Sequence, residues 1–317
     1  MKIAIIGSTN FDSIEYHLNE SFNYSGHQSQ IFDLPGGFAR SLYANNNDFI
    51  DLAEKIDQNH PDLIIVVYRI IHPIFVSKMK KNGYPIIQIN PDPLLTFDLQ
   101  QMFVEEYDVY FTKDPYIKRF MESNLKLNVK LYNEAFNSRV HIKPNADKLE
   151  YEKDFDIDVM IYGSMYPYRN KMLRKLVDND IDLTLFGNTN IPFFDESLRR
   201  YYSGYYITGE SKSKILYGAK IVFNNLHFAE IESVNNRFFE TNGSGAFQLS
   251  DYRPILKDLL PIDPELVSFC SIDEAVEKIK YYLKHPEERI TIAHKIYDHF
   301  ICNYTYDHLT KYILESI

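Results

Sequence analysis

The densest group of polar side chains in this sequence lies between Asn224 and Ala246, and the segment ends at a glycine pair. It opens where a predicted strand ends, and doubly wound α/β domains bind ligands beyond the carboxyl ends of their strands. Glu232 and Glu240 could hold different hydroxyls of one ligand, and His227 could hydrogen bond a phosphate or a sugar. Arg237 could balance negative charge. The alternative is a surface ion pair between Arg237 and Glu240, which are three residues apart on a predicted helix.

A glycine turn follows the first strand of the second half of the chain. Gly163 and Ser164 come directly after an apolar run, and Arg169 lies at the start of the next predicted helix. A bound diphosphate would gain from backbone amides, from the helix dipole and from a guanidinium group at such a turn. A Walker A motif is excluded because no Gly-Lys-Ser/Thr sequence follows. The alternative is that Arg169 is a solvated residue on the helix surface.

The first strand of the chain also ends in a glycine turn. Gly7 and Ser8 follow Ile6, but the G-x-G-x-x-G pattern of dinucleotide-binding domains is missing. A plain strand-to-helix turn is therefore the competing interpretation, and an NAD-type enzyme is not supported. Asp12, His72 and Asp92 also follow predicted strands of this half, so each could act as a general base, and the sequence does not rank them.

Metal chemistry has little support in the sequence. The runs Asp154–Asp158 and Asp178–Asp182 resemble D-x-D motifs but are better explained as polar edges of strands. The histidines lack an H-E-x-x-H-like pairing, and the two cysteines are too few for a structural zinc site. We therefore predict no metal and no bound cofactor. So few cysteines also favour a reducing, cytoplasmic setting.

Composition indicates a folded protein of two domains. The chain has 317 residues, of which 45% are hydrophobic. A chain of this length usually forms more than one hydrophobic core. With 34 Lys+Arg against 44 Asp+Glu, the net charge is −10 and no basic run suggests nucleic-acid binding. No apolar run approaches the roughly 20 residues that a membrane-spanning helix needs.

Short apolar runs alternate with longer amphipathic stretches, a pattern typical of βαβ units and parallel sheets. The first series of predicted strands is Lys2–Ile6, Gln30–Asp33, Asp62–Tyr68, Pro85–Ile89, Val109–Thr112 and Val129–Tyr132. The second series is Ile157–Tyr162, Asp182–Phe186, Lys220–Asn224, Ala246–Ser250 and Leu266–Cys270. The polar stretch Lys143–Asp156 is the best linker candidate.

These patterns predict helices between the strands, with Asp114 as the N-cap of one that begins at Pro115. We expect two Rossmann-like domains that face each other across a cleft, over residues 1–148 and 149–298. Residues 299–317 would form a C-terminal helix that returns to the first domain.

The segment from Asn235 to Tyr252 resembles the N-x-R-x-F-E and G-x-x-x-x-x-D-Y block of the CgeB-like (spore maturation protein) glycosyltransferases. Its Arg237-Phe238-Phe239-Glu240 sequence and its Gly245 and Asp251-Tyr252 carry the match. The Glu232-to-Glu240 spacing is similar to the E-x7-E motif of retaining GT-B glycosyltransferases. Further similarities are the turn at Gly163 and the tail His285-Pro286-Glu287-Glu288-Arg289.

This resemblance implies an α/β GT-B enzyme whose second domain binds a nucleotide-sugar and whose first domain presents the acceptor. Glu240 would bind the ribose, Glu232 the hydroxyls of the transferred sugar, and Arg237 and Arg169 the diphosphate. The full set of expected donor-binding residues is Gly163, Ser164, Arg169, Asn224, Asn236, Arg237, Glu240 and Gly245. The expected catalytic residues are Glu232, Arg237, His227 and Asp92, and the acceptor-side residues are Gly7, Ser8 and Asp12.

The predicted function is metal-independent transfer of a sugar, with retention of configuration, by a hexosyl- or related glycosyltransferase of class EC 2.4. A UDP-sugar is the expected donor, and the acceptor would be a glycan, a lipid-linked glycan or a protein. Two alternatives stay open: a non-catalytic nucleotide- or sugar-binding protein of the same fold, and a GT-B-like epimerase of nucleotide-sugars. Neither nucleic acid nor an integral membrane segment is expected.

Overall fold

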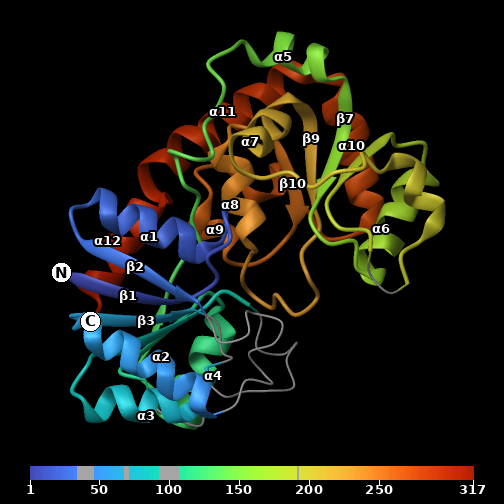
Figure 1. Ribbon diagram of the computed structural model, residues 1–317. Helices are drawn as coiled ribbons and strands as arrows, with labels where there is room; N and C mark the ends of the chain where they lie inside the picture. Colours follow the sequence, from blue (N-terminus) through green and yellow to red (C-terminus); the bar gives the residue numbers. More distant parts are fainter. Residues whose placement is uncertain (34–45, 68–70, 93–106, 191–192) are drawn as a thin grey trace. The chain divides into compact units, whose positions relative to one another are not determined.

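The computed structural model describes residues 1–33, 46–67, 71–92, 107–190 and 193–317 (Figure 1). The chain forms two compact units. Unit 1 contains Met1–Glu134, Phe228–Ser233 and Tyr306–Ile317, and unit 2 contains Ala135–His227 and Val234–Thr305. The boundary between the first part of unit 1 and unit 2 thus lies after Glu134, earlier than the predicted boundary at 148. A short segment of the second half of the chain, Phe228–Ser233, also belongs to unit 1.

Unit 1 is built on a parallel sheet of six strands in the order β2-β1-β3-β4-β5-β6. The strands are β1 (Lys2–Gly7), β2 (Gln28–Asp33), β3 (Leu63–Val67), β4 (Ile86–Asn90), β5 (Val109–Thr112) and β6 (Val129–Leu131). Every residue of β3, β4 and β5 is buried, as expected for parallel strands that helices cover on both faces. All six predicted strands are therefore present; Tyr68, the predicted end of β3, lies outside the described residues.

Helices cover both faces of this sheet. They are α1 (Ile14–Tyr24), α2 (Asn46–Asn59), α3 (Pro73–Lys81), α4 (Pro115–Leu125) and α12 (Tyr306–Glu315). Figure 1 shows α1 and α12 on one face and α2 and α3 on the other. The last helix is fixed to α1 by the Ser21 hydroxyl, which donates to Asp307 Oδ1 at 2.5 Å. The end of the chain thus packs on unit 1, with a helix that begins at Tyr306 rather than at 299.

Unit 2 has a parallel sheet of five strands in the order β11-β10-β9-β7-β8. The strands are β7 (Ile157–Tyr162), β8 (Leu183–Phe186), β9 (Ala219–Asn224), β10 (Gln248–Asp251) and β11 (Ser268–Phe269). Its helices are α5 (Lys148–Phe155), α6 (Pro167–Val177), α7 (Gly209–Gly218), α8 (Asn236–Gly243), α9 (Leu256–Leu259), α10 (Ile272–Lys284) and α11 (Pro286–Asn303). Two 3-10 turns, Glu196–Tyr201 and Pro264–Leu266, complete the unit, and the second of them replaces the start of the predicted last strand.

Both sheets place their first strand between the second and the third. The chain therefore runs outward in opposite directions from β1/β3 in unit 1 and from β7/β9 in unit 2. Such a reversal leaves a crevice beyond the carboxyl ends of the two central strands, which is where ligands of doubly wound sheets bind. The strand order thus indicates where a site should be sought in each unit.

The predicted linker at Lys143–Asp156 is wrong, because it contains the helix α5, which buries Lys148 and Glu152. The Asp147 side chain caps α5 at the backbone N–H of Glu150. Lys148 and Glu152 lie one helical turn apart, and both are at most 2% exposed. Glu152 accepts two hydrogen bonds from the Arg289 guanidinium, at 2.5 and 2.8 Å. Part of the charge of this segment is therefore paired inside unit 2, although Glu150, Lys153 and Asp154 are exposed.

Among the described residues, no helix combines the length and the apolar composition that crossing a membrane requires. Cys270 and Cys302 are both exposed free thiols.

We predict that Glu152→Gln lowers the free energy of unfolding by about 3–5 kcal/mol, because Arg289 and Lys148 would keep buried charges without a carboxylate. Urea unfolding followed by circular dichroism measures this change. Glu150→Gln is the matched control, because Glu150 pairs with Lys153 at the surface of the same helix and its loss should not shift the midpoint measurably. Equal midpoints for both variants would contradict a buried role for Glu152.

Candidate functional site

The turns after β7 and β9 bring two arginines together in unit 2. Gly163 follows β7 with φ 101°, a left-handed conformation that favours glycine. A Cβ at this position would lie 3.3 Å from Nη1 of Arg169 and 3.4 Å from Nη1 of Arg237. The turn after β8 approaches just as closely, because a Cβ on Gly187 would lie 2.4 Å from the Gly163 carbonyl oxygen. Glycine is therefore needed where the backbone passes the two guanidinium groups.

Arg169 is held entirely by neutral oxygens. It lies in the first turn of α6, which begins at Pro167, and it is 5% exposed. Its Nε donates to Asn225 Oδ1 at 2.9 Å, and Nη1 donates to the carbonyl oxygens of Ser164 at 2.6 Å and Tyr162 at 3.4 Å. Burial lowers the pKa of Arg169 well below its usual range, and the neighbouring Arg237 charge lowers it further. Keeping the guanidinium charged here is therefore costly.

Arg237 reaches the same carbonyl from the other side of the crevice. It lies at the start of α8, where the Asn235 side chain accepts a capping hydrogen bond from the Phe238 N–H. Its Nη1 donates to the Tyr162 carbonyl oxygen at 2.7 Å, and Nη2 donates to the Asn225 carbonyl oxygen at 3.2 Å. Two cations thus bond to the last residue of β7 and to the residue after β9.

This pair makes the crevice of unit 2 a place for a polyanion. Each guanidinium group bonds to backbone or amide oxygens, which are neutral acceptors. Asp251, at the end of β10, attracts both arginines electrostatically, while its Oδ2 accepts a hydrogen bond from the Leu226 N–H at 2.5 Å. Burial raises the pKa of the Asp251 carboxyl group. A diphosphate would supply the negative charge that suits two adjacent guanidinium forks.

Glu240 lies three residues after Arg237 but does not form the predicted surface pair. It is 4% exposed, and its Oε1 accepts from Lys212 Nζ and from Asn236 Nδ2, both at 2.9 Å. The Tyr162 hydroxyl lies 3.4 Å from its Oε2. Burial and the nearby Glu240 charge raise the pKa of Tyr162 well above its usual value. The surface-pair alternative is therefore wrong, and Glu240 belongs to a buried polar cluster of unit 2.

Other expected donor residues have structural contacts. The Asn224 amide exchanges hydrogen bonds with Asn235 and donates to Gln248, so it ties β9 to the start of α8. Gly245 follows α8 with φ 74°, where a Cβ would lie 2.7 Å from the Lys143 side chain. The His227 ring packs edge-on against Tyr166 at the start of α6, with 6.1 Å between ring centroids.

Glu232 lies in unit 1, although Glu240 lies in unit 2. The Arg119 guanidinium donates to both Glu232 carboxylate oxygens, at 2.6 and 3.0 Å. Asp114 caps α4 with one oxygen, as predicted, and its other oxygen accepts the backbone N–H groups of residues 231, 232 and 233. The 228–233 segment is therefore bound to the turn between β5 and α4.

A buried charge cluster secures the same segment. Lys113 Nζ lies 2.9 Å from Glu230 Oε1 and 3.1 Å from Glu134 Oε1, and all three residues are at most 6% exposed. Burial alone would lower the pKa of Lys113. The attraction of the Glu134 and Glu230 carboxylates is stronger, so the pKa of Lys113 is raised. Burial raises the pKa of Glu134 to about 8; Lys113 opposes this shift, whereas Glu230 and Asp92 add to it. A proton on Glu134 therefore balances the charges of the cluster.

In unit 1 the turn after β1 is filled by a carboxylate. Glu15 is fully buried, and its Oε1 accepts the Ser8 N–H at 2.8 Å. A Cβ on Gly7 would lie 2.2 Å from this oxygen. Burial raises the pKa of Glu15, while the Ser8 hydrogen bond opposes the shift. The amide that a phosphate could have used is thus bound internally, which agrees with the missing dinucleotide motif.

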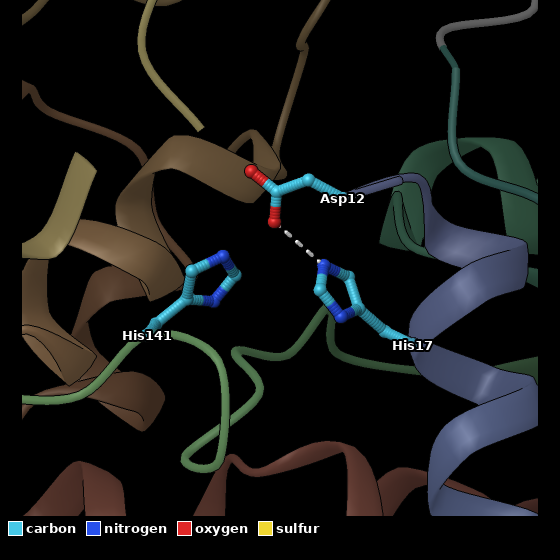
Figure 2. Close-up of side chains that lie close together, drawn as sticks. All are labelled: Asp12, His17 and His141. Atoms are coloured by element: carbon cyan, nitrogen blue, oxygen red, sulfur yellow. Dashed lines mark hydrogen bonds and ion pairs between the residues drawn. The ribbon is translucent and has the colours of Figure 1, made fainter. Parts of the chain in front are cut away.

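Asp12 is paired with a histidine at the same edge of the sheet. His17 Nε2 lies 2.9 Å from Asp12 Oδ1, and both side chains are at most 4% exposed (Figure 2). Asp12 has φ 66°, a left-handed conformation that Asp tolerates better than most residues. His72 caps α3 instead, with Nδ1 accepting the Ile74 N–H. Asp12 therefore has the partner of an acid–base pair, whereas His72 serves as a helix cap.

The sequence interpretation missed Asn225 and the Lys113 cluster. Asn225 stands beside Asn224, and the local sequence does not distinguish which asparagine meets the arginines. The partners in the Lys113 cluster are as far as 117 residues apart, so no local pattern pointed to it.

Comparisons with known proteins find similarities in sequence. Residues 169–315 match a family model described as "Glycosyl transferase-like". The chain is 23% identical over 273 residues to the spore protein CgeB of Bacillus subtilis (strain 168), covering 80% of this chain and 82% of that protein.

Solved structures resemble the whole chain. A sucrose-phosphate synthase from Thermosynechococcus elongatus matches with TM-score 0.72 at 12% identity, over 99% of this chain and 97% of that chain. Anabaena HepE in complex with UDP-glucose matches with TM-score 0.71 at 10% identity, over 100% of both chains. T4 phage BGT in complex with its UDP-glucose substrate matches with TM-score 0.61 at 16% identity, over 100% of this chain and 99% of that chain.

We predict that the free energy of unfolding falls as the pH rises from the ordinary carboxyl range toward about 8, because folded Glu134 holds its proton more tightly than the unfolded chain does. Glu134→Gln should remove about one proton from this dependence. Urea titrations between about pH 5 and pH 9 measure the slope. Glu122→Gln, at the surface of α4, is the control and should keep the wild-type slope; the same slope in Glu134→Gln would contradict the assignment.

Proposed function

Since the chain resembles the CgeB-like glycosyltransferases in sequence and has the α/β GT-B fold, we propose that it transfers a sugar from a nucleotide-diphospho-sugar to an acceptor hydroxyl. The observation that carries this proposal is the pair of guanidinium groups, Arg169 and Arg237, at the β7/β9 crevice of unit 2. The proposed donor site uses residues of that unit.

Departure of the nucleoside diphosphate is the main demand of this reaction. Negative charge grows on the leaving phosphate while the sugar passes through an oxocarbenium-like state. Donors that are fixed before the reaction stabilise such charge without reorganising. Arg169 and Arg237 are held by the Tyr162 carbonyl oxygen and by Asn225, so they meet this condition. They would also do the work that a divalent cation does in other transferases, which supports a metal-independent reaction.

Glu240 would bind the ribose of the nucleotide, as the family resemblance implies. Its carboxylate lies in the first part of α8, one turn beyond Arg237, and is positioned by Lys212 and Asn236. We take a UDP-sugar as the preferred donor. This preference is supported by the similarity to HepE and T4 phage BGT, whose structures contain UDP-glucose. The type of sugar stays a prediction of the hexosyl class.

Unit 1 would present the acceptor, a glycan, a lipid-linked glycan or a protein. Ser8 and Asp12 follow β1 at the strand-order reversal of that unit, and Asp12 is paired with His17. A cytoplasmic location stays a prediction from cysteine usage.

We expect one nucleoside diphosphate among UDP, GDP, dTDP and CDP to bind the purified protein with micromolar affinity, unchanged by EDTA. Calorimetry measures the binding, and release of sugar from the matching nucleotide-sugar measures turnover. Arg237→Ala should lower turnover by about 10²–10³-fold, because it removes one donor to the developing charge. Arg174→Ala, an exposed arginine of α6, is the control and should leave turnover unchanged.

Binding of none of the four diphosphates would reject the donor site. Binding without turnover would favour the non-catalytic alternative, and formation of an epimeric nucleotide-sugar would favour the epimerase. Binding that disappears with EDTA would reject metal independence.

We further expect retention of configuration, which rests on the Glu232-to-Glu240 spacing. Proton NMR of the sugar first released to water from an α-linked donor should show the α anomer before mutarotation. The β anomer would instead indicate inversion, and would assign the base role to an acceptor-side carboxylate such as Asp12.

A further inference from the structure

Asn225 touches both guanidinium groups of the proposed donor site. Its side-chain oxygen accepts from Arg169 Nε at 2.9 Å, and its main-chain oxygen accepts from Arg237 Nη2 at 3.2 Å. The side chain is 2% exposed. One residue therefore sets the positions of two cations that come from different helices, α6 and α8.

The turn that carries Asn225 is itself fixed. The next residue, Leu226, donates its backbone N–H to Asp251 Oδ2 at 2.5 Å, and the preceding Asn224 is bonded to Asn235 and Gln248. Asp251 is thereby directed to the backbone of the turn, and its charge acts on the arginines electrostatically. The Asn225 amide is thus held rigidly against Arg169.

A neutral side chain at this point has a specific consequence. A buried arginine is usually paired with a carboxylate, as Arg289 is with Glu152 in the same unit. At Asn225 the acceptor is an amide, which aligns the guanidinium group but brings no negative charge. An aspartate of the same shape would form a buried ion pair at this distance and would repel an incoming diphosphate.

We infer that Asn225 is a positioning residue of the donor site: its side-chain amide aligns Arg169 for the diphosphate of the donor without placing a negative charge beside it, and its main-chain carbonyl holds Arg237. The inference rests on the proposed function and adds a residue that determines how strongly the second phosphate is recognised.

The test compares UDP with UMP, because the two ligands differ by one phosphate. Calorimetry gives both dissociation constants for the wild type, Asn225→Asp and Asn225→Ala. Asn225→Asp should weaken UDP binding by about 10- to 100-fold, because it places a like charge beside the phosphates. UMP binding should change by no more than a few-fold, so the preference for UDP over UMP should collapse. A merely structural defect would weaken both ligands equally.

Two variants serve as companions. Asn225→Ala should reduce the preference for UDP by about 10-fold, because Arg169 loses its Nε partner whereas Arg237 keeps the main-chain carbonyl; it also replaces Asn225→Asp if that variant does not fold. Asn179→Asp adds the same charge beyond the end of α6 and should bind both ligands as the wild type does. Where GDP is the diphosphate that binds, GDP and GMP replace the pair.

The outcomes separate the two proposals. A wild type that prefers UDP, together with Asn225 variants that keep the same preference, overturns the role of Asn225 and leaves the donor site standing. A wild type that binds no nucleoside diphosphate overturns both. Loss of the preference in both Asn225 variants, but not in Asn179→Asp, supports the inference.

Discussion

The candidate site of unit 2 depends on one carbonyl oxygen shared by two cations. The last residue of β7, Tyr162, accepts hydrogen bonds from Arg169 and from Arg237, and the glycine turn that follows leaves room for both guanidinium groups. Like charges repel, and burial disfavours the charge of Arg169, so this arrangement needs fixed acceptors around it. The surrounding strands, the α8 N-cap and the turn after β9 supply those acceptors. This arrangement lowers local stability and produces a site that suits an anion.

The two units use the same strand order but differ in what fills the first turn. In unit 1 the Ser8 amide is bonded to the buried Glu15 carboxylate, which occupies the space that a side chain at Gly7 would need. In unit 2 the corresponding turn at Gly163 faces two arginines. The same topology thus has a turn bonded to a buried carboxylate in unit 1 and a turn beside two arginines in unit 2. Single residues make this difference, not the fold.

The chain passes between the units at residues that are anchored by charge. Glu134 is the last residue of the first part of unit 1, and Glu230 lies in the 228–233 segment; both bond to Lys113. Asp114 fixes the same segment through three backbone N–H groups. The residue after this segment is followed directly by Asn235, the cap of the helix that carries Arg237 and Glu240.

The sequence by itself determined the strands, because continuous apolar runs bounded by polar residues have few other solutions in a parallel sheet. It also determined local features such as the Asp114 cap and the position of Arg169 after a glycine turn. Only the tertiary structure decided which side chains meet. Asn225 rather than Asn224 contacts the arginines, because the Asn224 side chain is bonded to Asn235 and Gln248. The charged segment at Lys148 forms a helix with a buried carboxylate, Glu152, whose partner Arg289 is 137 residues away. Glu232 belongs to unit 1 because Asp114, 118 residues away, accepts its backbone N–H. Partners so distant leave no trace in local composition or spacing.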